Sequence, residues 1–264
     1  MPDRKSGRLH WAEHPTVPLD RVRAALNLDM VGRLRDDRLT VYGTRSGFGL
    51  RRLVSRQNED PGLTIDFSWE LEDDADHWTF FDRRIPVLFL HTGLHDEFHS
   101  PRDDAQRIDS RGMNRVARLA FHLLYDLAER PEVPRFREAA RRETEKLREQ
   151  LASETPKLRD RLGANWQVQL DGKPMRLGIT FLDDDAEPGT VVITYVVAGS
   201  PAAEAGLQAG DRIYQVDGND FADQRVLLEL LGAASDRLPL LIERQGQLRT
   251  VVVYFQEDLQ ARAA

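Results

Sequence analysis

Residues 85–103, IPVLFLHTGLHDEFHSPRD, carry the clearest sign of how the first half of this chain folds. Ile85 to Leu90 is an unbroken apolar run, as expected for a strand that is buried on both faces of a sheet. Pro86 lies near its start, where a missing backbone donor is tolerated. The polar residues from Thr92-Gly93 onward predict that a loop follows this strand directly.

The residues before this stretch indicate an α/β region that extends to about residue 129. A second apolar-rich run, Val22 to Leu28, ends at an acidic residue and then a glycine, which is typical of a buried strand that leads into a loop. Shorter strands are predicted over residues 39–43 and 63–69. Apolar residues at helical spacing predict helices over residues 47–58 and 115–127.

The composition narrows the class of protein. A chain of 264 residues is long enough for about two domains. Its net charge of -7 and pI of about 5.6 argue against a nucleic-acid-binding face. The absence of cysteine excludes disulfides, thiol catalysis and cysteine zinc sites. No apolar window is long enough for a membrane span, and no signal peptide is visible, so localisation stays open.

A charged segment separates the α/β region from the rest of the chain. Pro131 and Pro134 mark a break, residues 136–152 are almost entirely helix formers and charged residues, and Pro156 ends the run. We therefore expect a charged helical linker over residues 130–161. A coiled coil is the alternative, although the apolar stripe is too short for several heptads.

Four of the seven histidines gather in the first half of the chain. His77, His91, His95 and His99 fall within 23 residues, among several aspartates. Imidazole and carboxylate groups together are what zinc prefers. The last three histidines are spaced by four residues, so on a helix they would share one face. Gly93 and the preceding apolar run instead favour a strand followed by a loop.

The order of these segments resembles a known family. The run NLDMVGR (27–33), an Asp-His pair, the strand at 85–90 and the loop at 92–103 resemble the C-terminal half of the zinc aminopeptidases of metallopeptidase family twenty-eight. The resemblance covers about residues 9–128, and glutaminyl cyclases share the fold. It implies a partial mixed sheet flanked by helices, an incomplete zinc-exopeptidase fold. It also implies that Asp29 binds one of two zinc ions and His99 the other, with Phe98 in place of the usual Tyr.

The same resemblance assigns supporting roles to three further residues. Asp76 and His77 match a Ser-Asp-His motif, with Ala75 in place of the serine. They would lie in the second shell or on the substrate side, where they would orient ligands rather than bind metal. Asp103 matches the aspartate of an Asp-Thr pair, although a second aspartate replaces the threonine.

Peptide hydrolysis by two zinc ions, as the family performs it, also needs residues that this sequence lacks. The family supplies an upstream His-x-Asp with the bridging carboxylate, and a Glu-Glu pair with the general base. Neither motif occurs in these 264 residues. We therefore expect an aminopeptidase-like zinc exopeptidase at family level, but no catalytic residue and no activity in this chain alone.

Three explanations of this gap stay open. The chain is a gene model with a wrong start, which we favour, or one half of a split protein, or a decayed copy. The missing N-terminal half would then be a partner. Complete relatives are commonly exported.

The C-terminal part resembles a second family. The run SPAAEAGLQAGDRI (200–213), followed by VDG (216–218), resembles a PDZ domain of the bacterial protease type over residues 162–257, with a tail at 258–264. Arg176-Leu177-Gly178-Ile179 stands at the family's carboxylate-binding loop. The resemblance implies capture of peptide or protein C-termini by strand addition. One alternative is docking of this module on its own chain. Another is a non-catalytic PDZ protein with a vestigial peptidase scaffold.

Overall fold

The computed structural model describes residues 6–132, 134–151, 169–170, 173–174, 177–234 and 236–255. Two compact units are present. The first extends to Glu145 and includes Gln245–Gln247, and the second comprises Lys146–Arg244 and the residues from Leu248 onward. The described helices include none with the length and apolar character that a membrane crossing requires.

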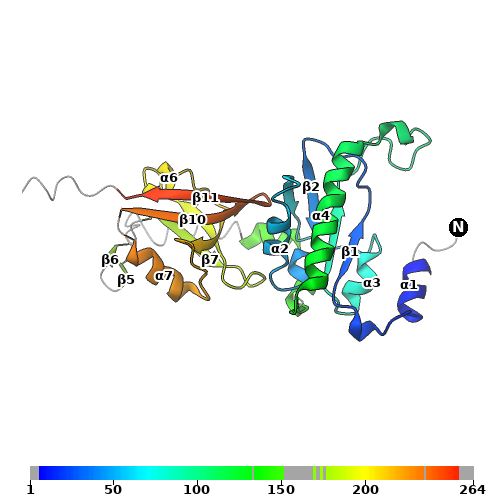
Figure 1. Ribbon diagram of the computed structural model, residues 1–264, viewed down its shortest axis with the longest axis horizontal. Helices are drawn as coiled ribbons and strands as arrows, with labels where there is room; N and C mark the ends of the chain where they lie inside the picture. Colours follow the sequence, from blue (N-terminus) through cyan, green and yellow to red (C-terminus); the bar gives the residue numbers. More distant parts are fainter. Residues whose placement is uncertain are drawn as a thin grey trace, which may run out of the picture. The chain divides into compact units, whose positions relative to one another are not determined.

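The first unit is built on a four-stranded mixed sheet (Figure 1). Its strands are β1 (Ala25–Leu28), β2 (Arg38–Tyr42), β3 (Thr64–Phe67) and β4 (Val87–His91), in the order β1-β4-β2-β3. β1 runs parallel to β4, β2 runs antiparallel to β4, and β3 is parallel to β2. All four strands arise from the predicted runs, and the mixed sheet is confirmed.

Helices lie on both faces of this sheet. The α-helices of the first unit are α1 (Ser6–Glu13), α2 (Leu50–Gln57), α3 (His77–Asp82) and α4 (Ser110–Glu129). Single 3₁₀ turns are η1 (Leu19–Arg21), η2 (Thr44–Ser46), η3 (Ala105–Arg107) and η4 (Glu138–Arg141). The longest helix, α4, begins after Asp109, whose carboxylate accepts a hydrogen bond from the Gly112 amide at 3.0 Å. This N-cap satisfies one of the backbone donors that every helix start leaves open.

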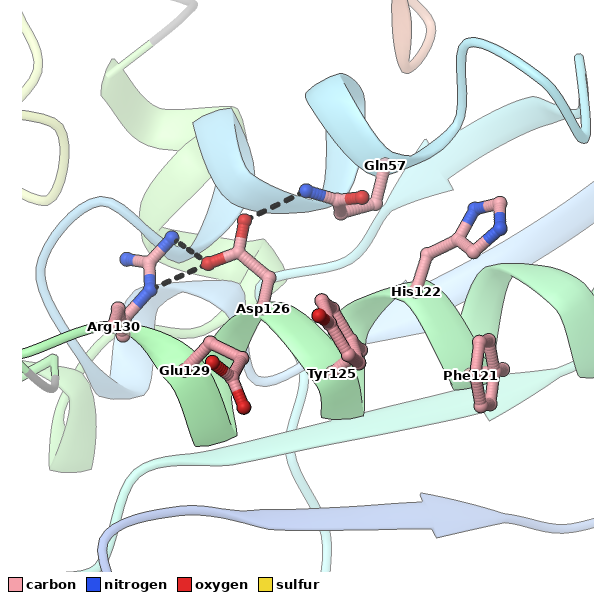
Figure 2. Close-up of a pocket in the computed structure, with 7 residues that line it drawn as sticks. All are labelled: Gln57, Phe121, His122, Tyr125, Asp126, Glu129 and Arg130. Carbon is pink, nitrogen blue, oxygen red and sulfur yellow. Dashed lines mark hydrogen bonds and ion pairs between the residues drawn. The ribbon is translucent and has the colours of Figure 1, made fainter.

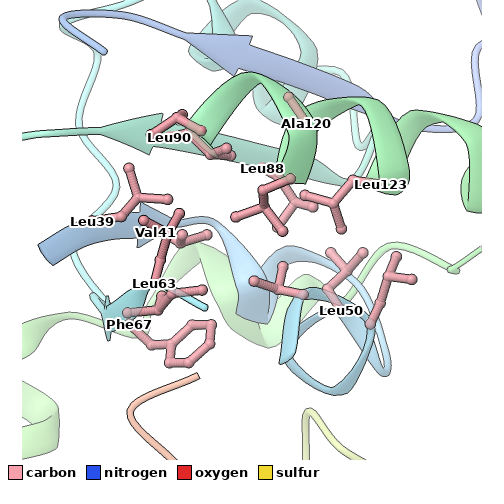
Figure 3. Close-up of a cluster of buried hydrophobic side chains, with 14 of the residues drawn as sticks. Leu39, Val41, Leu50, Leu63, Phe67, Leu88, Leu90, Ala120 and Leu123 are labelled. Carbon is pink, nitrogen blue, oxygen red and sulfur yellow. The ribbon is translucent and has the colours of Figure 1, made fainter. Parts of the chain in front are cut away.

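The core of the first unit lies between the sheet and the helices α2 and α4 (Figure 3). Leu88 and Leu90 of β4 point into it together with Leu39 and Val41 of β2. Because side chains alternate along a strand, Phe89 and His91 point to the opposite face. There the ring of His77, from α3, stacks on Phe89 with 4.7 Å between centroids. One face of the sheet thus carries the apolar core, and the opposite face carries aromatic and titratable side chains.

The segment 134–145, which we call the strap, differs from the predicted linker helix. Phe136 forms a backbone bridge with Gly47, and the Arg137 amide donates to the Ser46 carbonyl at 2.8 Å. A single 3₁₀ turn, η4, follows, and regular helix begins only at Glu145. The strap thus packs on the first unit. Predicted residues 152–161 of the linker lie outside the described residues.

The second unit contains a five-stranded sheet. Its strands are β7 (Ile179–Asp183), β8 (Val191–Val196), β9 (Arg212–Val216), β10 (Arg237–Arg244) and β11 (Gln247–Tyr254), in the order β11-β10-β9-β8-β7. β7, β8, β9 and β10 pair antiparallel to one another. A two-stranded pair, β5 (Gln169–Leu170) and β6 (Lys173–Pro174), is separate. β7 forms the edge of the larger sheet.

Among the described residues that follow β7, two helices start at side-chain caps. α6 (Pro201–Glu204) begins after Ser200, whose hydroxyl accepts from the Ala203 amide. α7 (Gln224–Ala233) begins after Asp223, whose carboxylate accepts from the Val226 amide at 2.9 Å. Serine and aspartate are strong N-cap residues, which explains both starts.

Candidate functional site

The candidate metal ligands of the first unit lie beyond the ends of two neighbouring strands. β1 and β4 are parallel and pair Leu28 with Leu90. The backbone amide of Asp29 donates to the Leu90 carbonyl at 3.3 Å. The loop that begins at Asp29 and the loop that follows β4 and carries His99 therefore leave the same end of the sheet. The carboxyl end of parallel strands is where open α/β sheets bind ligands.

Contacts between the two loops hold them together. The Thr92 hydroxyl donates to the Met30 carbonyl, and Arg35 donates to the Leu94 carbonyl at 2.6 Å. Arg33 binds Asp103 through an Nη2–Oδ1 contact of 3.2 Å. Asp103, predicted as a supporting residue, therefore takes part in a cross-link between the loops.

Two residues of these loops have an unusual backbone conformation. Met30, next to Asp29, has φ of 53°, and His99 has φ of 55°. Left-handed φ is uncommon for residues other than glycine, and such residues gather at functional sites. The side chains of Asp29 and His99 are exposed. The His99 ring stacks on Phe98 with 3.8 Å between centroids.

The Asp76-His77 pair lies at the start of α3. Asp76 is exposed and precedes the first turn of the helix. His77 is only 1% exposed and stacks on Phe89. The ring is thus enclosed by the first unit, and both of its predicted supporting roles stay predictions.

His91 is a residue of this region that the sequence reasoning did not assign. It ends β4, where it pairs with Thr40 of β2, and its Nδ1 accepts a hydrogen bond from the Gly93 amide at 2.8 Å. Burial lowers the pKa of His91 from 6.5, and the nearby carboxylates of Asp29 and Asp74 oppose this effect. The only signal in the sequence is the position of His91 at the end of an apolar run.

Tyr42 of β2 lies on the same face of the sheet. Its ring stacks on Phe89 with 5.3 Å between centroids. Burial raises the pKa of Tyr42, and the carboxylates of Asp74, Glu72 and Glu145 raise it further. Tyr42 therefore stays protonated at neutral pH and can donate a hydrogen bond.

The candidate ligands can be compared with what zinc requires. Zinc in proteins takes at least three protein ligands. Across the described ranges, no group of three or more His, Asp and Glu side chains is placed to hold a metal ion. Because His91 ends a strand whereas His95 and His99 lie in the loop, the three-histidine helical face is not formed. Asp29 and His99 are two side chains, one fewer than the smallest number of protein ligands that zinc takes.

A surface hollow of about 450 Å³ lies elsewhere, on α4 (Figure 2). In it, Asp126 accepts from Gln57 at 2.7 Å and from Arg130. The lining residues are Gln57, Phe121, His122, Tyr125, Asp126, Glu129 and Arg130. None of them is a candidate ligand, so this hollow has no part in the metal site.

The candidate peptide site of the second unit lies at the start of β7. Leu177 and Ile179 are buried, and Gly178 between them has φ of 77°. A Cβ at Gly178 would lie 2.3 Å from the Cβ of Ser200. Among the described strands β7 lies at an edge of its sheet, a position that suits strand addition by a peptide. Arg176, also predicted for this loop, lies outside the described residues.

The two units of the chain match two different protein families. Residues 6–124 match the model of peptidase family M28, and residues 192–244 match that of the PDZ domain. Residues 6–124 are a peptidase family M28 segment. We call these residues the M28 segment. The second match, over residues 192–244, identifies a PDZ domain in the C-terminal part of the chain. Both resemblances predicted from the sequence are confirmed.

Individual relatives match parts of the chain. A Lactococcus lactis protein described as a zinc metalloprotease is 37% identical over 76 residues, which are 28% of this chain and 18% of that protein. The LapA aminopeptidase of Legionella pneumophila is 20% identical, with a TM-score of 0.40, over 47% of this chain and 34% of LapA. The HtrA3 PDZ domain bound to a phage-derived ligand is 21% identical, with a TM-score of 0.27, over 30% of this chain and 83% of that domain. The chain thus spans about a third of LapA and less than a fifth of the Lactococcus protein.

Proposed function

We propose that the M28 segment contributes Asp29 and His99 to the zinc site of an aminopeptidase-like metallopeptidase. The observation that carries this proposal is the geometry at β1 and β4. Both candidate ligands lie in loops that leave one end of two adjacent parallel strands, and these loops are bonded to each other. The match to peptidase family M28 supports the reaction class.

We further propose that these 264 residues do not hydrolyse peptides unaided. The sequence contains no His-x-Asp and no Glu-Glu pair. Loss of a general base alone costs a factor on the order of 100 to 10,000 in rate. The second zinc ion of the family, and the bridging carboxylate between the ions, would need donors beyond Asp29 and His99.

Two surfaces of the first unit support a partner that supplies those donors. β1 lies at the edge of the sheet, and Leu28 is 39% exposed. On α4, Phe121, Leu124 and Tyr125 are all more than half exposed. An open strand edge and apolar side chains in water favour association with another α/β segment. An N-terminal peptidase half would fit both surfaces.

The test measures zinc and hydrolysis in the purified chain. We expect less than one zinc ion per chain by elemental analysis and no release of product from aminoacyl amides. Addition of a polypeptide that carries the His-x-Asp and Glu-Glu motifs should restore both signals, and Asp29→Ala should abolish them again. Stoichiometric zinc together with Asp29-dependent hydrolysis by the chain alone would contradict the proposal of inactivity.

A second function is favoured by the PDZ domain itself. We propose that it binds the C-termini of peptides or proteins along β7. The position of β7 at the edge of the sheet formed by the described residues, and the left-handed turn at Gly178 packed against Ser200, support this proposal. The apolar side chains of Val226 and Leu230 on α7, which are partly buried against the core, would line the opposite wall.

Matched peptides separate this function from docking on the chain itself. NMR titration with a peptide that ends in a free carboxylate should shift the amides of Leu177, Gly178 and Ile179. The same peptide with an amidated end should bind at least about tenfold more weakly, because a charged hydrogen-bond acceptor is lost. No shift with either peptide would favour docking on the chain itself.

A further inference from the structure

The guanidinium group of Arg33 lies among three side chains of the loop that carries His99. Its Nη2 is 3.0 Å from Glu97 Oε2, 3.2 Å from Asp103 Oδ1 and 3.4 Å from His95 Nδ1. Only 16% of the Arg33 side chain is exposed. A charged group that is this well shielded makes stronger hydrogen bonds than one in open solvent.

A second arginine closes the network. Arg107 Nη1 is 2.6 Å from the other carboxylate oxygen of Glu97, and Arg33 Nη1 donates to the Arg107 carbonyl at 3.0 Å. The nearly buried ring of His95 lies between the two acids, 3.4 Å from Glu97 and 3.7 Å from Asp103. Both acids are therefore held in place from more than one side.

These anchors flank His99. Glu97 precedes it by two residues and Asp103 follows it by four. Between the anchors, the Ser100 amide donates to the Glu97 carbonyl at 2.9 Å, and the Asp103 amide donates to the Ser100 carbonyl at 3.2 Å. The left-handed φ of His99 is unfavourable in a free chain, so the turn needs support from its surroundings.

Arg33 belongs to the other loop, four residues after Asp29. We propose that Arg33 is a positioning residue, which fixes the His99 turn relative to Asp29 through Glu97 and Asp103. The roles of Asp29 and His99 as ligands rest on the function proposed above. The fixed position of the turn is a property of the chain without metal, and it can be measured without metal.

Hydrogen exchange of the full chain tests this proposal. In Arg33→Gln, the amides of the turn, Phe98, Ser100 and Asp103, should exchange about 10- to 100-fold faster, because a charged hydrogen-bond network is lost. The amides of Leu119 and Leu123 in α4 should keep their rates. Arg38→Gln is the matched control, because it removes an exposed ion pair with Asp66 from the same unit without touching the turn.

Two further readouts separate positioning from a general loss of stability. Arg33→Lys keeps the charge but not the forked geometry, and it should recover part of the protection. The His99 ring resonances, which are set by its stacking on Phe98, should move toward those of an unstacked histidine in Arg33→Gln and partly return in Arg33→Lys. If Arg33→Gln fails to fold, Asp103→Asn removes one arm of the network and should give the same local pattern.

Unchanged exchange at the turn would overturn the proposal, as would faster exchange that extends equally to Leu119 and Leu123. The outcome that contradicts the proposed zinc-binding function is different from the outcome that contradicts the role of Arg33. If His99 binds no zinc in the completed enzyme, the exchange data stand. If Arg33→Gln leaves the turn protected, zinc binding at His99 stands without Arg33.

Discussion

Arg137 and Glu143 form an ion pair with two parallel contacts, Nη1–Oε2 at 3.0 Å and Nη2–Oε1 at 3.1 Å. Arg45 binds the same carboxylate at 2.8 and 2.9 Å, and its guanidinium lies 3.9 Å from the ring centroid of Trp69. One glutamate of the strap is thus held by two arginines, one of which is only 4% exposed. This cluster fastens the strap to the first unit.

Removal of that glutamate should destabilise the first unit. Glu143→Ala leaves two shielded arginines without their counter-charge, which should lower the free energy of unfolding by about 3 kcal/mol. Glu138→Ala is the control within the strap, because Glu138 and its partner Arg84 are both more than half exposed. The control should change stability by less than about 0.5 kcal/mol in urea denaturation. Equal effects of the two variants would contradict the role of the cluster.

The same cluster predicts a loss of stability in acid. Burial pushes the pKa of Glu143 up, but hydrogen bonds from Arg45 and Arg137 outweigh it and hold the pKa below its ordinary 4.5. A carboxyl group with a lowered folded pKa stabilises the folded state above its ordinary pKa, and that stability is lost as the pH falls through the folded value. We expect the Tm to fall below pH 4.5, and to fall less steeply in Glu143→Gln.

His91 should be a neutral ring with a defined tautomer. Its Nδ1 accepts from the Gly93 amide, so in the neutral ring the proton lies on Nε2. Because burial lowers its pKa, the ring should titrate below pH 6.5. Protonation then favours the unfolded chain as the pH falls below 6.5. A ¹⁵N NMR titration measures both properties, and a midpoint above 6.5 would contradict the assignment.

Substitutions at two glycines of the PDZ domain, which have nearly equal φ, can distinguish the cost of backbone strain from the cost of a steric overlap. Gly178 has φ of 77° and faces Ser200, whereas Gly206 has φ of 78° and has no atom near the position of a Cβ. Gly206→Ala should cost about 1–2 kcal/mol, for the left-handed backbone alone. Gly178→Ala should cost about 1–3 kcal/mol more, because the methyl group overlaps Ser200. Equal losses in thermal unfolding would show that Ser200 moves aside.

Local sequence patterns were sufficient for most elements. The apolar runs at 22–28 and 85–90 became β1 and β4, because few other structures bury such runs completely. Ser200 and Asp223 cap the starts of α6 and α7 through local contacts, because a short polar side chain satisfies free helix amides. The loop containing His99 followed from Gly93 and the end of an apolar run.

The strap shows where local patterns failed. Residues 136–144 have the composition of a helix, and propensity favours one by only tenths of a kcal/mol per residue. Ion pairs of Glu143 with Arg45 and Arg137, together with the backbone bond from Arg137 to Ser46, outweigh that preference. Arg45 lies 98 residues before Glu143, and Ser46 is similarly far from Arg137, so no local window of the sequence contains these contacts.

The residue types and their alternation were enough to predict two units and the strands of the first sheet, and the resemblance of residues 27–33 and 92–103 to metallopeptidase family twenty-eight supplied the candidates Asp29 and His99. The pairing of β1 with β4, the placement of His91 beside Asp29 and the convergence of Glu97 and Asp103 on Arg33 became known only from the folded chain. The physical reason is that secondary structure depends on neighbours within a few residues. A site depends on contacts across 60 to 70 residues, which form only when the whole sheet closes.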